Sequence, residues 1–77
     1  MKIYFSKKAE KYLLSLPLNI STNILNRIEL IPKGDIKHLK GRKNEYRLRI
    51  GKFRILFFIS KEEIYIFKID SRGDIYK

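Results

Sequence analysis

The chain has 77 residues and a formal net charge of +10, from 18 lysines and arginines against 8 aspartates and glutamates. This length fits one small domain, residues 1–77, and excludes a two-domain or barrel enzyme. The absence of cysteine and the single histidine exclude a disulfide framework, a thiolate metal site and a histidine-rich metal cage. Hydrophobic residues make up 44% of the chain, which indicates a packed fold. The excess positive charge favours a polyanionic partner.

The N-terminus does not resemble a signal peptide, because charged residues rather than an apolar run follow Met1 to Phe5. The longest apolar stretch, Ile55 to Ile59, is much shorter than the roughly 20 residues of a membrane helix. We therefore expect a cytoplasmic protein with no membrane partner.

The first half of the chain predicts one strand and two helices. Ile3 to Phe5 is short and β-prone, and Ser6 can cap the helix that follows. The apolar face of this helix consists of Ala9, Tyr12, Leu13 and Leu16. Pro17 ends it. A second helix is expected from about Asn19 to Ile31, with the apolar stripe Ile20, Ile24, Leu25, Ile28 and Ile31. With so short a joint, the two helices predict a helical hairpin.

The second half predicts an antiparallel meander. Pro32 to Asn44 is expected to be a basic loop, anchored only by Ile36 and Leu39. The apolar residues of the following strands, which form the expected core face, are Tyr46, Leu48, Ile50, Phe53, Ile55 and Phe57. A turn at Ser60 to Glu63 then leads into a last long strand, Ile64 to Ile69. The fold class is therefore α+β, with the helices on one face of the sheet.

Gly51 and Lys52 predict a two-residue hairpin turn, which places Arg49 directly opposite Arg54 and Arg47 on the same face. Like charges that face each other destabilise a sheet, so we expect removal of Arg54 to leave folding intact or improved. Guanidinium groups gathered without acids between them favour a phosphate site, since their forks match phosphate oxygens. A solvated polar face is the alternative interpretation.

Two features of the sheet are ambiguous. Leu56 and Phe58 fall on the arginine face, where the C-terminal tail, a partner protein, or both must cover them. In the last strand, Tyr65, Phe67 and Ile69 occupy one face, and a bulge or an odd-length loop would direct this set into the core.

The positive charge is concentrated in residues 33–54, where nine basic residues and two acidic residues give a net charge of +7. We expect this segment to be the footprint of the polyanionic partner, with Lys40, Arg42, Lys43 and Lys52 among its contacts. The single histidine, His38, is expected at the surface. No metal-ligand spacing, nucleophile motif or phosphate-binding glycine loop is visible, so we expect no cofactor.

Three segments of the sequence together resemble the RelE/ParE superfamily of toxins. They are residues 36–41 (IKHLKG), residues 46–55 (YRLRIGKFRI) and the ending, residues 72–77 (RGDIYK). The resemblance covers essentially the whole chain and implies the small ribonuclease-like toxin fold. RelE-type members are mRNA-cleaving toxins that act in the ribosomal A site and are held inactive by an antitoxin.

The resemblance also implies a set of catalytic residues and a reaction. The family's basic strand residues, its later arginines and its terminal tyrosine correspond to Arg47, Arg49, Arg54, Arg72 and Tyr76. The implied reaction is metal-independent attack of a 2′-hydroxyl on the adjacent phosphate, which leaves a 2′,3′-cyclic phosphate. The implied partners are the mRNA, the ribosome and an acidic RelB-like antitoxin, with DNA contacted only through the antitoxin complex.

The sequence departs from the family's pattern in two places. Arg47 and Arg49 stand where the best-known RelE toxin has lysines, and arginine is a poor general base because it stays protonated. Tyr76 and Lys52 are the candidates that remain for the base. The chain also ends at Lys77, so we expect no C-terminal helix like that of longer members. Two alternatives stay open: a ParE-like inhibitor of DNA gyrase, and an RNA-binding module without catalysis.

Overall fold

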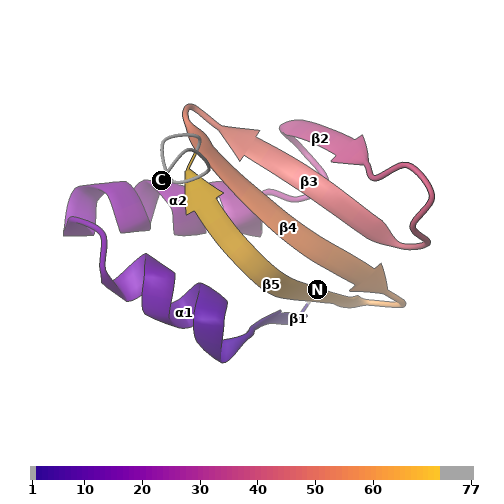
Figure 1. Ribbon diagram of the computed structural model, residues 1–77, viewed down its shortest axis with the longest axis horizontal. Helices are drawn as coiled ribbons and strands as arrows, with labels where there is room; N and C mark the ends of the chain where they lie inside the picture. Colours follow the sequence, from indigo (N-terminus) through magenta and orange to yellow (C-terminus); the bar gives the residue numbers. More distant parts are fainter. Residues whose placement is uncertain (1, 72–77) are drawn as a thin grey trace.

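A computed structural model of the protein describes residues 2–71, which form two helices and one five-stranded sheet (Figure 1). Along the chain the elements are β1 (Lys2–Phe5), α1 (Lys7–Leu14), α2 (Leu18–Glu29), β2 (Asp35–His38), β3 (Glu45–Ile50), β4 (Phe53–Ser60) and β5 (Glu63–Ser71). The strand order is β1-β5-β4-β3-β2, in which β1 runs parallel to β5 and all the other pairs are antiparallel. This arrangement confirms the predicted α+β class.

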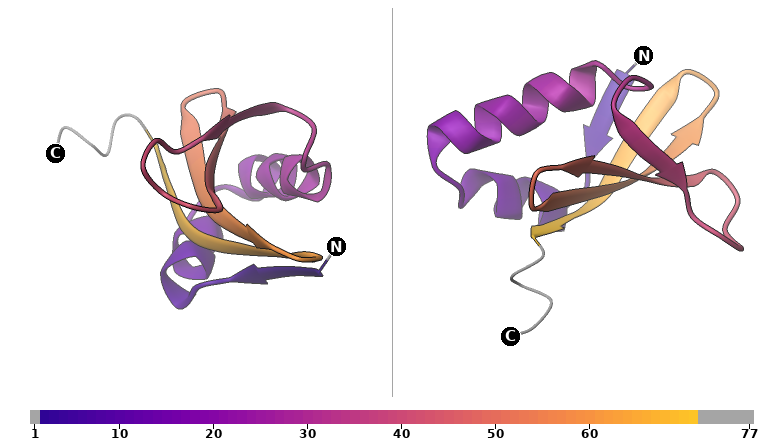
Figure 2. Two further views of the ribbon diagram at one scale, coloured as in Figure 1. Left: turned by 90° about the vertical axis from the view of Figure 1, so that its right-hand side faces the viewer. Right: turned by 90° about the horizontal axis from the view of Figure 1, so that it is seen from above.

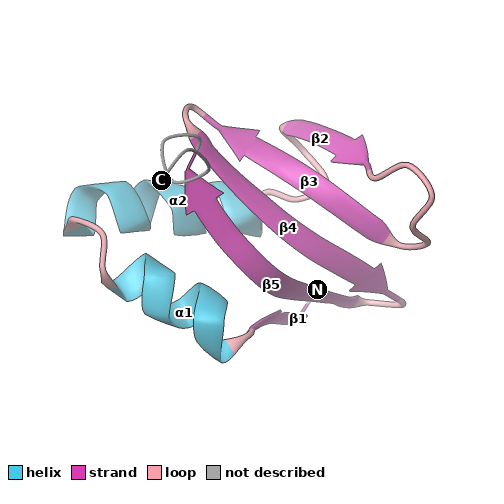
Figure 3. Ribbon diagram, in the orientation of Figure 1, coloured by secondary structure: helices cyan, strands magenta, loops and turns pink. Residues whose placement is uncertain are grey.

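Both predicted helices are present, although α1 ends at Leu14, before Pro17, and α2 ends at Glu29, before the expected Ile31. Ser6 caps α1 by accepting a hydrogen bond from the backbone N–H of Ala9 at 3.0 Å. Pro17 lies between the helices, at the N-cap of α2. The buried residues of α1 and α2 face the sheet together, and both helices lie on the same side of it (Figures 2 and 3). The other face of the sheet, called the outer face below, is covered by no helix among residues 2–71.

The core lies between the helices and the inner face of the sheet. Its largest fully buried side chains are Phe57, Ile24, Ile28, Leu48, Ile55, Ile64 and Ile66. The predicted inner face of β3 and β4 is confirmed, with Tyr46 half-buried against the core. Because every second residue of these strands points inward, the intervening residues must point to the outer face.

The turn between β3 and β4 fixes the register of the predicted site. Gly51 has φ +57°, a conformation that glycine adopts without the steric cost of a Cβ. The strands pair Ile50 with Phe53 and Arg49 with Arg54, as a two-residue turn requires. The predicted pairing of the two arginines is therefore confirmed.

The segment expected to be a basic loop contains a short edge strand, β2, which pairs with β3. Only Ile36 of its four residues packs against the core. A strand is recognised in a sequence by the alternation of apolar and polar residues, and β2 is too short and too polar to show that pattern. The prediction that Pro32 to Asn44 is a loop was therefore wrong for these residues. The charged side chains of β2 suit an edge strand, because they discourage pairing with another chain.

The prediction for β5 was half right. A register shift occurs opposite Leu56 and Phe57, so a bulge is present. However, β5 directs Ile64, Ile66 and Ile69 into the core and leaves Tyr65 and Phe67 outside. The reason is that Phe67 and Lys68 are both outside the core on the bulged strand, after which the alternation resumes with Ile69 inside.

Candidate active site

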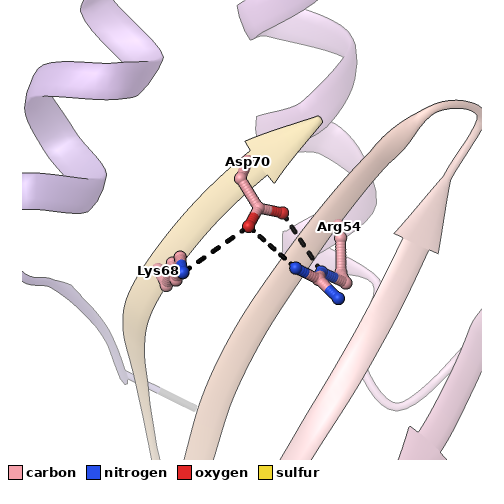
Figure 4. A network of polar contacts seen from close by, with 3 residues as sticks. All are labelled: Arg54, Lys68 and Asp70. Carbon is pink, nitrogen blue, oxygen red and sulfur yellow. Dashed lines mark hydrogen bonds and ion pairs between the residues drawn. The ribbon is translucent and has the colours of Figure 1, made fainter. Parts of the chain in front are cut away.

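Arg54 lies on the outer face and is held by a carboxylate from β5. Asp70, its register partner, accepts a bond from Nε at 3.1 Å and one from Nη2 at 2.9 Å (Figure 4). The Lys68 Nζ lies 3.8 Å from the same carboxylate. The hydrogen bond to Asp70 and the charge of Asp70 raise the pKa of Arg54 above its usual value, although partial burial opposes them. Arg54 is therefore permanently charged and cannot act as a base.

The contact with Asp70 orients the Arg54 guanidinium. A guanidinium carries five N–H groups, and Asp70 takes only the edge formed by Nε and one proton of Nη2. Nη1 points away from Asp70 (Figure 4). The edge formed by Nη1 and the second Nη2 proton is thus fixed in direction and suited to two phosphate oxygens.

Arg47 is the more buried arginine, since its side chain is only 12% exposed. Its Nη1 lies 3.9 Å from the Asp35 carboxylate, which is too long for a hydrogen bond, and Nη1 is buried without a hydrogen-bond partner. A buried, unsatisfied donor on a charged group is unfavourable. An anion that drew the guanidinium a short way outward would relieve this cost.

Arg47 and Arg54 line one hollow of about 320 Å3 on the outer face, which we call the basic pocket. The connection between β2 and β3 contributes Leu39, Lys40 and Arg42 to its lining. The strands contribute Glu45, Arg47, Arg54, Leu56 and Phe67. Glu45 is held 3.4 Å from Arg42 Nη1. The pocket therefore combines four cations and one acid with an apolar floor.

The other predicted site residues lie elsewhere. Arg49 is exposed and lines a smaller cavity of about 110 Å3 with Arg27 and Lys33, and Lys43 lines a hollow beside His38 and Tyr46. Lys52 lies in the β3–β4 turn, over the Phe53 ring and beside α2. It is not part of the basic pocket, so the structure gives no support to Lys52 as the base. Arg72 and Tyr76 lie outside the described residues.

The structure also corrects two expectations about the outer face. Acids do lie among the arginines: Asp35 comes from β2 and Asp70 from β5, so the guanidinium groups are not left to repel one another. Phe58 is partly covered by aromatic rings of β5, at centroid distances of 4.6 Å to Phe67 and 6.1 Å to Tyr65. Some of the cover therefore comes from within residues 2–71.

Sequence reasoning missed Asp70 because regular alternation misplaces it, and it missed Phe67 because Tyr65, Phe67 and Ile69 were expected to face the core together. Without the bulge, Arg54 would pair with Ile69, and Asp70 would fall on the core face opposite Phe53. An unpaired carboxylate is very unfavourable in a core. That conflict was the one signal in the sequence that could have located the bulge.

Residues 2–71 contain no group of three or more His, Cys, Asp and Glu side chains placed to hold a metal ion. No helix in this part of the chain has the length and apolar character needed to span a membrane.

The chain is similar to known proteins over almost its whole length. Residues 3–76 match the family described as ParE toxin of type II toxin-antitoxin system, parDE. The chain is 32% identical to the toxin RelE3 of Methanocaldococcus jannaschii, over 99% of this chain and 96% of that protein. The chain belongs to the RelE/ParE superfamily of type II toxins. It is a RelE-like member.

Solved structures of RelE-like toxins share its fold. One is a RelB–RelE antitoxin–toxin complex from Methanococcus jannaschii, with a TM-score of 0.79, 32% identity and 95% of this chain and 94% of that chain covered. Another is an archaeal RelE–RelB complex from Pyrococcus horikoshii, with a TM-score of 0.76, 28% identity and 94% of each chain covered. The toxin's sheet and helices are thus those of the RelE fold.

Proposed function

We propose that this toxin is a metal-independent endoribonuclease that cleaves mRNA in the ribosomal A site, in the cytoplasm. The basic pocket is the observation that carries the proposal: Arg47 and Arg54 line one hollow beneath the basic β2–β3 connection. Similarity to RelE toxins along almost the whole chain supports it.

In this reaction the 2′-oxygen bonds to the adjacent phosphorus, and the bond from phosphorus to the 5′-oxygen breaks. A 2′,3′-cyclic phosphate and a 5′-hydroxyl result, while a base takes the 2′ proton and an acid protonates the 5′-oxygen. The free edge of Arg54 would bind the phosphate oxygens as charge develops on them. Arg47 would bind the same group and thereby satisfy its buried Nη1 donor.

The proton-transfer groups are not the arginines, since a guanidinium does not deprotonate in proteins. Tyr76 stays the candidate base by its resemblance to the family. Lys68, beside Asp70 on the same face, is added as a candidate acid because its ammonium group can donate a proton.

A primer-extension assay on translated mRNA tests the proposal. Arg54→Ala should lower cleavage about 100-fold or more if Arg54 stabilises the transition state. Arg27→Ala is the matched control, because it removes the same charge and side chain from α2, outside the basic pocket. Equal cleavage by the wild type and Arg54→Ala, both folded, would remove Arg54 from the site.

The proposed partner is an acidic RelB-like antitoxin. Two toxins of similar structure were solved in complexes with RelB. An acidic segment on the outer face would neutralise the basic pocket and cover its apolar floor. Any contact of the toxin with DNA would be made through this complex.

A ParE-like action on DNA gyrase is the second candidate, and the match to the ParE toxin family favours it. A gyrase supercoiling assay separates the two functions. Inhibition of supercoiling without mRNA cleavage would support the ParE-like function. RNA binding without either activity would indicate a binding module that has lost catalysis.

A further inference from the structure

Phe67 contributes an aromatic ring to the outer face at the bulge in β5. Its side chain lies outside the core and lines the basic pocket with Leu56. The pairing shifts by one residue after Phe67, so that Lys68 pairs with Leu56 and Asp70 pairs with Arg54. Bulges are often found next to active sites, where they redirect a side chain. An aromatic ring thus lines a hollow that the β3–β4 hairpin lines with arginines.

The Phe67 ring is supported from behind. Phe58 packs against it with a centroid distance of 4.6 Å and an angle of 32° between the rings, and Tyr65 stacks on Phe58 in turn. Its backbone is also fixed, because the Ser6 hydroxyl donates a 3.0 Å hydrogen bond to the Phe67 carbonyl. A ring supported in this way keeps its orientation and loses little freedom when a flat group stacks on it.

The chemistry of the pocket identifies its ligand. The floor formed by Leu56 and Phe67 is apolar, whereas Lys40, Arg42, Arg47 and Arg54 surround it with positive charge. A nucleotide has both complementary parts, a flat base and an anionic phosphate. The volume of about 320 Å3 lies at the small end of the roughly 300–1,000 Å3 range of small-ligand sites.

We propose that Phe67 is the floor of a nucleobase subsite, on which a base next to the phosphate bound by Arg47 and Arg54 stacks. The inference deepens the proposed ribonuclease function and rests on it. Aromatic rings beside basic grooves bind bases in this way, and every base has a face that can stack. An acidic peptide would satisfy the cations but would not need an aromatic floor.

Fluorescence of 2-aminopurine tests the inference directly. The probe is a 2′-O-methyl oligoribonucleotide, which cannot be cleaved, with 2-aminopurine at each position in turn. Wild-type protein should quench one position. Phe67→Ala should abolish this quenching and weaken binding about 10-fold, the typical effect of one lost stacking contact. A probe that is abasic at the quenched position should bind the wild type and Phe67→Ala equally.

Matched variants distinguish loss of the Phe67 ring from general destabilisation of the sheet. Phe67→Leu keeps an apolar side chain but loses the ring, so it should behave as Phe67→Ala even if the alanine variant folds poorly. Phe67→Tyr keeps the ring and should behave as the wild type. Tyr4→Ala removes an exposed aromatic residue from β1, outside the pocket, and should also behave as the wild type.

The outcomes separate this inference from the proposed function. If the wild type cleaves mRNA but folded Phe67→Leu binds and quenches normally, the nucleobase subsite is wrong and the ribonuclease proposal stands. If the variants lose affinity for the antitoxin and not for the oligonucleotide, the pocket binds protein and the inference is overturned. If the wild type neither binds the probe nor cleaves mRNA, both proposals are wrong.

Discussion

At the scale of single residues, Asp70 determines how Arg54 works. On the sequence alone, Arg54 was expected to be repelled by Arg49, so that its removal would leave folding intact or improve it. In the structure, Asp70 neutralises Arg54 and fixes its orientation through two hydrogen bonds. Removing either partner leaves the other without its counter-charge on a partly buried surface. The expectation about the folding of Arg54 variants is therefore reversed.

Asp70→Asn tests this dependence. The free energy of unfolding should fall by about 1 to 2 kcal/mol, because charge-assisted hydrogen bonds are lost from a half-exposed guanidinium. Cleavage should fall as well, because the free edge of Arg54 is no longer fixed. Urea unfolding and the cleavage assay measure the two effects. In the control Glu62→Gln, the carboxylate is exposed in the turn between β4 and β5, so stability should hardly change.

At the scale of elements, turn chemistry was predictable and irregular pairing was not. The Gly51-Lys52 turn specifies its own register, so the positions of Arg47 and Arg54 could be deduced from the sequence. The bulge in β5 is set by core packing across the sheet, and its one signal in the sequence is that regular pairing would bury Asp70. The bulge decides the position of Asp70. The strand β2 was missed because only Ile36 points inward.

Ser6 connects two of these elements, and its replacement gives an element-scale prediction. Its hydroxyl caps α1 at the Ala9 N–H and donates to the Phe67 carbonyl at the bulge. Ser6→Ala should lower the free energy of unfolding by about 1 to 2 kcal/mol. Ser21→Ala is the control, since that hydroxyl bonds only within α2, to the Leu18 carbonyl. Equal thermal stability of the two variants would show that the Ser6 contacts contribute little.

At the scale of the whole molecule, charge is separated from the core. The helices and the inner face of the sheet bury the apolar residues, while the outer face gathers the side chains of the basic pocket. The sequence revealed this polarity as the net charge of +7 in residues 33–54. It could not reveal which cations share one hollow, because Arg49, Lys43 and Lys52 of the same segment line other hollows.

The salt dependence of RNA affinity should therefore reflect the few cations that contact phosphates, and not the net charge of the whole protein. Four cations line the basic pocket. If each neutralises one phosphate, a plot of log affinity against log salt for single-stranded RNA should have a slope of about −3. Titration of an oligoribonucleotide at several salt concentrations measures it. A flat plot would contradict the basic footprint, whereas a slope of about −6 would extend it to all nine basic residues of 33–54.

The antitoxin should compete for the same surface, because the outer face is the one that no described helix covers. Leu56 lies on the floor of the basic pocket, so an antitoxin segment that fills the pocket must contact it. Leu56→Ala should weaken the complex about 10-fold, through loss of roughly 1.5 kcal/mol of apolar burial. Leu14→Ala is the control, since Leu14 is 78% exposed at the end of α1. Calorimetry with the cognate antitoxin measures both affinities. A loss of affinity confined to Leu14→Ala would contradict the prediction, because it would place the antitoxin on the helical side and leave the pocket open in the complex.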